Sequence, residues 1–344
     1  MAKRVTIKDV AREAGVSIAL VSLVLHARLD AEGNPVCSVR RETARRIFDA
    51  VQKLGYIPNR AAAAIRSGRS YSIAVITSDI SNSFFSRICR HVENLAYDQG
   101  YNVIFASSDE NPTKFTQVLD STLRLGVDGM IIVPPPHSEV AIGKISAMNI
   151  PIVLLERDIE GVEAAGRVLL DNASADRLAV EEFVRGGYRR IELVAYNMDV
   201  STIRSRIEGY RRAMEGMGLG DCAKVHYLEY GADVDAMARL LRNAADRGCE
   251  AVYLTTNTIS LLALQALKRL RMNVPGDMAV LGFDESPAFS IAEPSVSHIV
   301  QPVRALGEES FSMLVEMIED KDAARTVVLP PELVRGGSSA PSGQ

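Results

Sequence analysis

Residues 6–27 read TIKDVAREAGVSIALVSLVLHA, and this stretch decides the fold of the first part of the chain. Thr6 is followed three residues later by Asp9, which is the spacing of a helix capping box. Gly15 suits the left-handed residue that ends a helix, and Ser17 can cap the next one. Two short helices joined this tightly predict a helix-turn-helix. The side chains expected on the inner face of the first helix are Ile7, Val10, Ala11 and Ala14.

The second helix of this motif has an unusual outer face. Val21, Val24 and Leu25 face inward, which leaves Ile18, Ala19, Ser22 and Leu23 facing outward near the end that enters the major groove in such motifs. Three of these four side chains lack a hydrogen-bonding group, so on DNA they would discriminate mainly through the thymine methyl group, with Ser22 on a phosphate. Two alternatives stay open: the head has lost sequence-specific recognition, or the insertion at 27–38 supplies the missing polar contacts.

The charge of the chain is divided unevenly. Residues 1–70 carry 13 Lys and Arg against 6 Asp and Glu, a net charge of +7, while the remainder carries 26 basic and 37 acidic residues, a net charge of −11. A basic head on an acidic body suggests that only the head meets a polyanion. A solvated helical surface would produce the same imbalance, so charge alone does not decide.

A third helix over residues 42–54 completes the head, with Ile47, Val51 and Leu54 inward. Two connections flank it. The stretch HARLDAEGNPVCS (26–38) is interpreted as a surface loop because of its Gly-Asn-Pro turn signal. The alanine-rich residues 59–70 are too short to form a stable isolated helix, so they predict a linker unless packing stabilises them.

From residue 72 onward, short apolar runs alternate with helical segments, which predicts doubly wound parallel sheets. Most of these runs are almost continuously apolar, as strands covered on both faces must be. Their number and the chain length suit two Rossmann-like lobes with a ligand at the carboxyl ends of the strands. The nine runs are SIAVIT, YNVIFAS, GMIIVP, IPIVLLE, VLLD, IELVAY, KVHYLEY, AVYLTT and MAVLGFD.

Polar residues at the expected strand ends form a candidate ligand site. Glu156 and Asp284 each follow an apolar strand, Asn257 follows another, and Arg206 opens a helix. Carboxylates accept hydrogen bonds from vicinal hydroxyls and arginine donates to hydroxyls or ring oxygens, so the set fits a sugar-like or nucleoside-like ligand. A helix cap or a structural ion pair is the competing interpretation at each position.

Other function classes find little support in the sequence. No nucleotide-binding glycine motif, nucleophile elbow or zinc-protease motif occurs, and the five histidines and four cysteines lack metal-ligand spacing. We therefore expect no enzyme activity, no cofactor and no metal. No apolar signal core or long apolar run is present, which predicts a cytoplasmic protein. A transporter's solute-binding protein and a cytoplasmic sugar-modifying enzyme stay open as alternatives.

The sequence resembles the lactose-repressor (LacI/GalR) family of bacterial transcriptional regulators along almost its whole length. The resemblance is carried by TIKDVAREAGVS, LGYIPNRAA, ISNSFFSRI, GVDGMIIVPP, IPIVLLERD, DNASADRLAVEEFVRGGYRRIELV, RSRIEGYRRAM and VPGDMAVLGFDES. It implies a homodimer with a periplasmic-binding-protein-like body that binds pseudo-palindromic double-stranded operator DNA under the control of a sugar-like effector.

The resemblance also implies domain boundaries. These are a helix-turn-helix head over 1–58, a hinge over 59–71, a first lobe over 72–168 and 297–325, a second lobe over 169–296 and 326–338, and a tail over 339–344. The chain departs from the family pattern at Arg40, where a helix-capping Ser or Ala is usual, at Glu156, where Asp is usual, and at Thr256–Asn257, where Asn-Asp is common.

Finally, the resemblance implies the contact residues. Ile65 matches an aliphatic lever that inserts into a minor-groove step and bends the DNA. The implied DNA contacts are Thr6, Ser17, Ile18, Ala19, Ser22, Leu23, Tyr56, Asn59, Arg60, Ala62 and Ile65. The implied effector contacts are Phe84, Phe85, Glu156, Arg206, Asn257 and Asp284.

Overall fold

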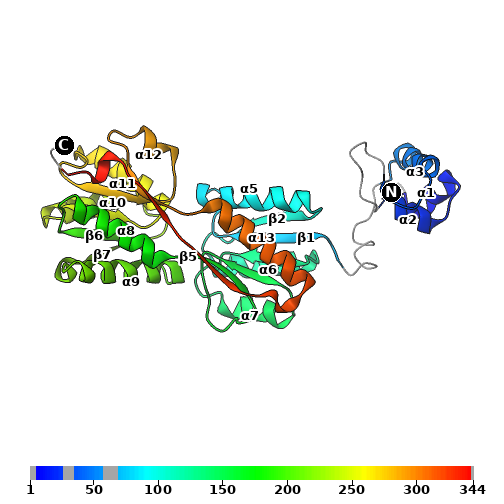
Figure 1. Cartoon of the computed structure of the whole chain (residues 1–344), viewed down its shortest axis with the longest axis horizontal. Coiled ribbons are helices and arrows are strands. Elements are labelled where there is room, and N and C mark those ends of the chain that lie inside the picture. The colour runs from blue at the N-terminus through cyan, green and yellow to red at the C-terminus, as the bar shows by residue number, and fades with distance from the viewer. Residues whose placement is uncertain (1–4, 26–34, 57–68, 342–344) are drawn as a thin grey trace. The chain divides into compact units, whose positions relative to one another are not determined.

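The computed structural model describes residues 5–25, 35–56 and 69–341. It divides into two compact units, Met1–Ser70 and Tyr71–Gln344, which we call the head and the body (Figure 1). The head is helical and the body contains two mainly parallel sheets covered by helices, so the α/β fold expected from the sequence is confirmed. Among the described residues, no helix is both long enough and apolar enough to cross a membrane.

Three helices form the described part of the head: α1 (Ile7–Ala14), α2 (Ile18–Leu25) and α3 (Arg41–Leu54). The capping box forms, because the Thr6 N–H donates to Asp9 Oδ2 at 2.9 Å. Gly15, at φ 65°, ends α1, and Ser17 Oγ accepts from the Leu20 N–H at 3.2 Å to start α2. The helix-turn-helix is therefore built by the residues that predicted it. Its core includes Val10, Val21, Val24 and Ile47.

Arg40 stands at the N-cap of α3 and makes no side-chain capping bond. Arginine carries only donors, so it has nothing to offer the free N–H groups at a helix start.

The first lobe of the body is a six-stranded sheet in the order β11-β5-β4-β3-β1-β2, in which all neighbours are parallel. Its strands are β1 (Ser72–Thr77), β2 (Asn102–Ser107), β3 (Gly129–Ile132), β4 (Ile152–Leu155), β5 (Gly166–Leu170) and β11 (Thr326–Leu329). Its helices are α5 (Ser83–Asp98), α6 (Pro112–Arg124), α7 (Glu139–Ala147) and α13 (Val303–Glu319).

The second lobe repeats this plan in the order β12-β10-β9-β8-β6-β7, with only the β10–β12 pair antiparallel. Its strands are β6 (Ile191–Tyr196), β7 (Lys224–Leu228), β8 (Ala251–Leu254), β9 (Ala279–Phe283), β10 (Ser297–Val300) and β12 (Glu332–Val334). Its α-helices are α8 (Asn172–Arg185), α9 (Ser201–Gly216), α10 (Val234–Asp246), α11 (Asn257–Leu270) and α12 (Pro287–Ile291). The matching order makes β4 of the first lobe equivalent to β9 of the second.

Three strands depart from the expected lobe boundaries. β10 pairs with β9 in the second lobe, although 297–325 was expected in the first, and β11 pairs with β5 in the first lobe, although 326–338 was expected in the second. β5 lies wholly in the first lobe, two residues past the expected boundary. A strand belongs to the sheet whose hydrogen bonds it completes, and these short segments carry no pattern that distinguishes one sheet from the other.

The expected tail is also wrong at its first residue. Ser339 is 1% exposed, and its hydroxyl lies 2.6 Å from that of Ser297 in β10. The chain folds into the second lobe through this contact because Ser339 bonds a buried polar group there.

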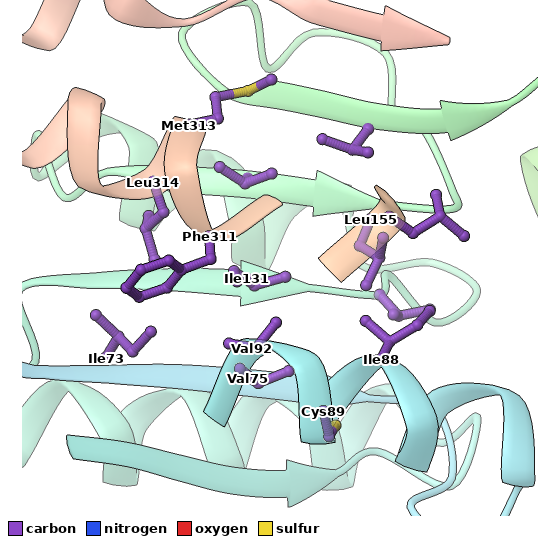
Figure 2. Packing of buried hydrophobic residues seen from close by; sticks show 14 of the residues in the cluster. Ile73, Val75, Ile88, Cys89, Val92, Ile131, Leu155, Phe311, Met313 and Leu314 are labelled. Carbon is purple, nitrogen blue, oxygen red and sulfur yellow. The ribbon is translucent and has the colours of Figure 1, made fainter. Parts of the chain in front are cut away.

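Alternating residues of each strand cover the two faces of a sheet, as period-2 geometry requires. In the first lobe, Ile73 and Val75 face α5 and α13, whereas Ala74 and Ile76 face α6 and α7. Figure 2 shows Phe311 and Leu314 of α13 packed near Ile73 of β1 and Ile131 of β3, in the same core cluster as Val92 and Ile88 of α5. A segment beginning at residue 303 thus completes the core of the lobe that starts at residue 72.

Candidate functional site

The outer face of α2 is exposed as the sequence predicted. Ile18 and Leu23 are 39% and 47% exposed, and Ser17 and Ala19 are exposed as well, while Ser22 is half-buried. Val21 and Val24 lie in the head core on the opposite side. The face that would enter a groove of DNA therefore exposes three apolar side chains, those of Ile18, Ala19 and Leu23.

The remaining head residues implied as DNA contacts have mixed environments. Thr6 is exposed, and its hydroxyl donates to Asp9 Oδ2 at 2.7 Å. Tyr56 is half-buried against the head core, and its N–H donates to the Val51 carbonyl oxygen at 3.0 Å. Asn59, Arg60, Ala62 and Ile65 lie outside the described residues, as do positions 26–34 of the expected surface loop. Contact of any of these residues with DNA stays a prediction.

A cleft lies between the two lobes of the body, at the carboxyl ends of strands from both sheets. Its cavity volume is about 130 Å³, which is roughly ten times what a single buried water requires. The lining residues are Ser78, Asp79, Asn82, Phe84, Phe85, Glu110, Glu156, Arg157, Tyr196, Met198, Thr202, Ile203, Arg206, Tyr230, Gly231, Thr256, Thr258 and Asp284.

Arg206 of α9 is the central cation of the cleft and is 2% exposed. Its Nε donates to Asn172 Oδ1 at 2.8 Å and its Nη1 to the Thr255 carbonyl oxygen at 2.7 Å. Its guanidinium carbon lies 3.9 Å from the centre of the Phe283 ring, a cation–π contact. These contacts fix the plane of the guanidinium group while one edge reaches across the cleft.

That edge forms an ion pair between the lobes. Arg206 Nη2 lies 3.3 Å from Oε1 of Glu156, which follows β4 of the first lobe. A second link is made by the backbone, because the Asp158 N–H donates to Ser201 Oγ at 2.8 Å. The ion pair therefore joins the lobes within the cleft, whereas the Asp158–Ser201 bond joins them outside it.

Glu156 and Asp284 occupy equivalent positions, directly after β4 and β9. Both have left-handed backbone conformations, with φ of 65° and 64°. Residues other than glycine rarely adopt this conformation, and such strain concentrates at functional sites. The strained backbone presents one carboxylate from each lobe to the cleft.

Asp284 is held by two donors. The Gln301 side-chain amide donates to its Oδ1 at 2.8 Å, and the Asn257 N–H donates to its Oδ2 at 3.3 Å. Burial raises the pKa of Asp284 to about 6, although Arg206 and both hydrogen bonds oppose the rise.

The raised pKa gives a testable dependence of stability on pH. Above the pKa of an unfolded aspartic acid and below about 6, the native Asp284 is protonated while the unfolded residue is ionised. Stability from this group is therefore lost as pH rises through that window. We expect the free energy of unfolding of Asp284→Asn, relative to the wild type, to increase by roughly 2 kcal/mol between pH 4.5 and pH 7.5. Urea denaturation of both proteins measures it, and a constant difference would show that Asp284 has an ordinary pKa.

Phe84 and Phe85 begin α5 and line the cleft as expected. Each is 4% exposed, and their ring centres lie 4.9 Å apart in an edge-to-face arrangement. Asn82 caps the helix by accepting from the Phe84 N–H at 3.0 Å, which fixes where the pair enters the cleft.

Asn257 differs from its expected role. Thr256 and Thr258 line the cavity, whereas Asn257 between them is buried and supplies its backbone N–H to Asp284. It is the first residue of α11, so its N–H is one of the free donors at a helix start. Its side-chain Nδ2 has no partner among the described residues.

The sequence did not single out several residues of the site. Arg157 donates to both carboxylate oxygens of Glu110, at 2.8 and 2.7 Å, and both side chains are more than nine-tenths buried. Asn172 and Gln301 hold Arg206 and Asp284. Arg157 directly follows Glu156 at the end of an apolar strand, a signal that could have identified it. The partnership with Glu110, 47 residues away, carried no such signal.

The close packing of α9 against α8 helps to position Arg206. A Cβ atom added to Gly209 of α9 would lie 2.2 Å from Asp176 Oδ2 of α8. Asp176 is fully buried and accepts from the Tyr253 hydroxyl at 3.0 Å. Gly209 therefore lets α9 pack against α8 one turn away from Arg206.

The chain matches two family models, the bacterial regulatory proteins of the lacI family over residues 6–59 and a periplasmic binding protein-like domain over residues 180–339. It is 30% identical over 328 residues to the ribose operon repressor of Bacillus subtilis (strain 168), covering 95% of both chains.

Two solved structures share the fold. A lac repressor dimer bound to operator and the anti-inducer ONPF is 23% identical, with a TM-score of 0.82 over 98% of this chain and 100% of that one. A complex of the transcriptional regulator CelR with cellobiose is 25% identical, with a TM-score of 0.69 over 97% and 100%. The helix-turn-helix head, the two-lobed body and these similarities together show that the chain belongs to the LacI family of bacterial regulatory proteins.

Proposed function

We propose that this protein is a homodimeric transcriptional regulator, most simply a repressor, that binds pseudo-palindromic double-stranded operator DNA in the cytoplasm. A small sugar-like ligand bound between the lobes controls its affinity for the operator. The observation that best supports this proposal is that one chain combines an exposed helix-turn-helix face with a cleft bridged by Arg206 and Glu156. The proposal assigns the cleft to binding and regulation, with no catalytic step.

The head supports DNA binding through charge and shape. Its net charge of +7 supplies phosphate contacts, and the free face of α2 suits the major groove. The related lac repressor was solved as a dimer on its operator. A dimer would place two heads on two half-sites, which is why we expect a pseudo-palindromic site.

The cleft supports binding of a polyhydroxylated ligand. Carboxylates of Glu156 and Asp284 accept from hydroxyl groups, and the paired rings of Phe84 and Phe85 provide an apolar wall. The related CelR structure holds cellobiose. Such a site combines a few polar groups that orient the ligand with an apolar surface that it covers.

Coupling between ligand and DNA would arise from the links between the lobes. A ligand that competes for Arg206 or Glu156 changes the 3.3 Å ion pair that joins them. A ligand shifts an equilibrium only by its different affinity for two states, so a contact present in one lobe arrangement and altered in another is what allostery requires.

The direct test is selection of DNA bound by the full-length protein from a random library. We expect a pseudo-palindromic consensus to be enriched, and addition of sugars to the winning complex should change its anisotropy. Retention of ligand binding without any enriched sequence would favour the alternative of a small-molecule-binding protein with weak or lost DNA specificity.

The apolar face of α2 gives a sharper prediction about sequence recognition. Since Ile18 and Leu23 can read bases mainly through the thymine methyl group, replacing half-site thymines by uracil should weaken binding. We expect a loss of roughly 1 kcal/mol per contacted thymine, at the lower end of the effect of a mismatched pair. Leu23→Ala should remove the difference at one thymine, measured by anisotropy on both operators. If uracil and Leu23→Ala both leave affinity unchanged, another segment reads the bases.

A further inference from the structure

The charges that line the ligand cleft are predominantly negative. Four carboxylates face two guanidinium groups, and no lysine or histidine is among the residues that line it. The acidic residues are Asp79, Glu110, Glu156 and Asp284, and the basic residues are Arg157 and Arg206. Clefts lined by one sign of charge concentrate ligands of the other sign and repel ligands of the same sign.

Neither arginine is free to receive an anion. Both Nη groups of Arg157 donate to Glu110, at 2.8 and 2.7 Å, and Nη1 also donates to the Pro134 carbonyl oxygen at 3.0 Å. Arg206 donates to Asn172, to the Thr255 carbonyl oxygen and to Glu156. An anionic ligand would have to displace a buried carboxylate from one of these groups, leaving that carboxylate unpaired in a dry site.

A buried donor of Arg157 points to the same conclusion. Arg157 Nε has no hydrogen-bond partner among the described residues, although the side chain is 8% exposed and lines the cleft. It lies 3.9 Å from Glu156 Oε2. Because this Nε is buried and lies beside the Glu156 carboxylate, it offers no open cationic site to a phosphate.

Asp79 adds a charge that no cation balances within the described residues. Its carboxylate accepts from the N–H and hydroxyl of Ser81, at 2.8 and 2.7 Å, and no lysine or arginine lies within ion-pair distance in that part of the chain. The pKa of Tyr230, which also lines the cleft, is raised by burial and then by the charges of Glu110, Asp79 and Asp109. The field on this side of the cleft is therefore negative.

We infer that the ligand of this cleft carries no anionic group: it is an uncharged or amino-bearing polyhydroxy compound, and phosphorylated sugars and sugar acids are excluded. The inference rests on the proposed function, since it names the chemical class of the ligand bound there. Anionic ligands are excluded because placing a negative charge against an uncompensated carboxylate is strongly unfavourable. Such repulsion discriminates between ligands as effectively as an attractive contact does.

The electrostatic field in the cleft can be measured without knowing the identity of the ligand. A thiol placed in the cleft by Thr258→Cys, at an exposed lining position, is treated in the full-length protein with two methanethiosulfonates that carry either an ammonium or a sulfonate group. Ser121→Cys, on an exposed position of α6 between Asp120 and Arg124, is the matched control. Met198→Cys, at a second lining position, serves if Thr258→Cys does not fold. Peptide-resolved mass spectrometry gives the rate at each thiol.

We expect the ratio of cationic to anionic rates to be about tenfold higher in the cleft than at the control position, the lower end of what such focusing produces. Adding Asp79→Asn should lower the ratio several-fold while keeping the bonds from Ser81. Equal ratios at the two positions, or no effect of Asp79→Asn, would overturn the inference. So would a phosphorylated sugar that raises the melting temperature more than its uncharged parent. If instead the proposed function were wrong, the full-length protein would enrich no DNA sequence from the random library, and the modification rates of the thiols would be unchanged.

Discussion

We expect Arg206→Ala to abolish the response of the protein to its ligand and to leave operator binding intact. This is the largest effect that we expect. Removing the guanidinium group deletes the bonds to Asn172 and Thr255 and takes from Glu156 the nearer of its two cationic neighbours. A hydrogen bond from a charged group to a ligand contributes about 1.5–3 kcal/mol, so we expect ligand affinity to fall by about tenfold to a hundredfold. Asp284→Ala should act in the same direction because it removes an acceptor from the opposite side of the cleft.

Calorimetry with a sugar that stabilises the wild type measures the affinity, and anisotropy of labelled operator measures DNA binding. Arg204→Ala is the matched control, because Arg204 lies on the same helix, is exposed and pairs with Asp199 outside this cavity. Ligand affinity that is unchanged in both Arg206→Ala and Asp284→Ala would remove these residues from the site.

The second large effect concerns DNA and salt. The intact protein, as the dimer that we propose, should bind its operator at least about a hundredfold more tightly than a fragment of residues 1–58 at equal salt, because two linked heads act together. Raising salt from 50 to 200 mM should weaken the intact protein by about 10³-fold or more if six or more phosphates are neutralised. Titrations at several salt concentrations give the slope. Equal affinity of fragment and intact protein would contradict the contribution of the dimer.

Local sequence patterns predicted most of the head. The capping pair Thr6 and Asp9, the left-handed Gly15 and the apolar spacing around Val21 each act within a few residues, so the sequence contains their whole cause. The outward positions of Ile18 and Leu23 followed from the same spacing. What these residues contact on DNA depends on a partner and stays a prediction.

The body was predictable as far as its signals were local. Apolar runs indicated the buried strands, and the acids after β4 and β9 indicated the cleft. The lobe assignment of β10 and β11 depends on which distant strand supplies hydrogen bonds, and the residues themselves do not encode that choice in a readable pattern. The same limit applies to the pairing of Arg157 with Glu110 and to the support of Asp284 by Gln301, since each joins elements far apart in the chain.

The place of α13 in the first lobe has a consequence for the protein as it leaves the ribosome. Strands β1 to β5 are synthesised by residue 170, but Phe311 and Leu314 that cover them, and the edge strand β11, follow only between residues 303 and 329. At translation rates of about 5–20 residues per second, the nascent lobe waits roughly 8–30 s for its missing helix and strand. Ile73, Val75 and Ile131 are covered by α5 alone during that interval and lack their contacts with α13, whereas the head, which is continuous in sequence, can fold at once. Chaperone dependence should therefore arise from the first lobe, and shortening the chain before residue 303 should leave that lobe aggregation-prone and the head folded.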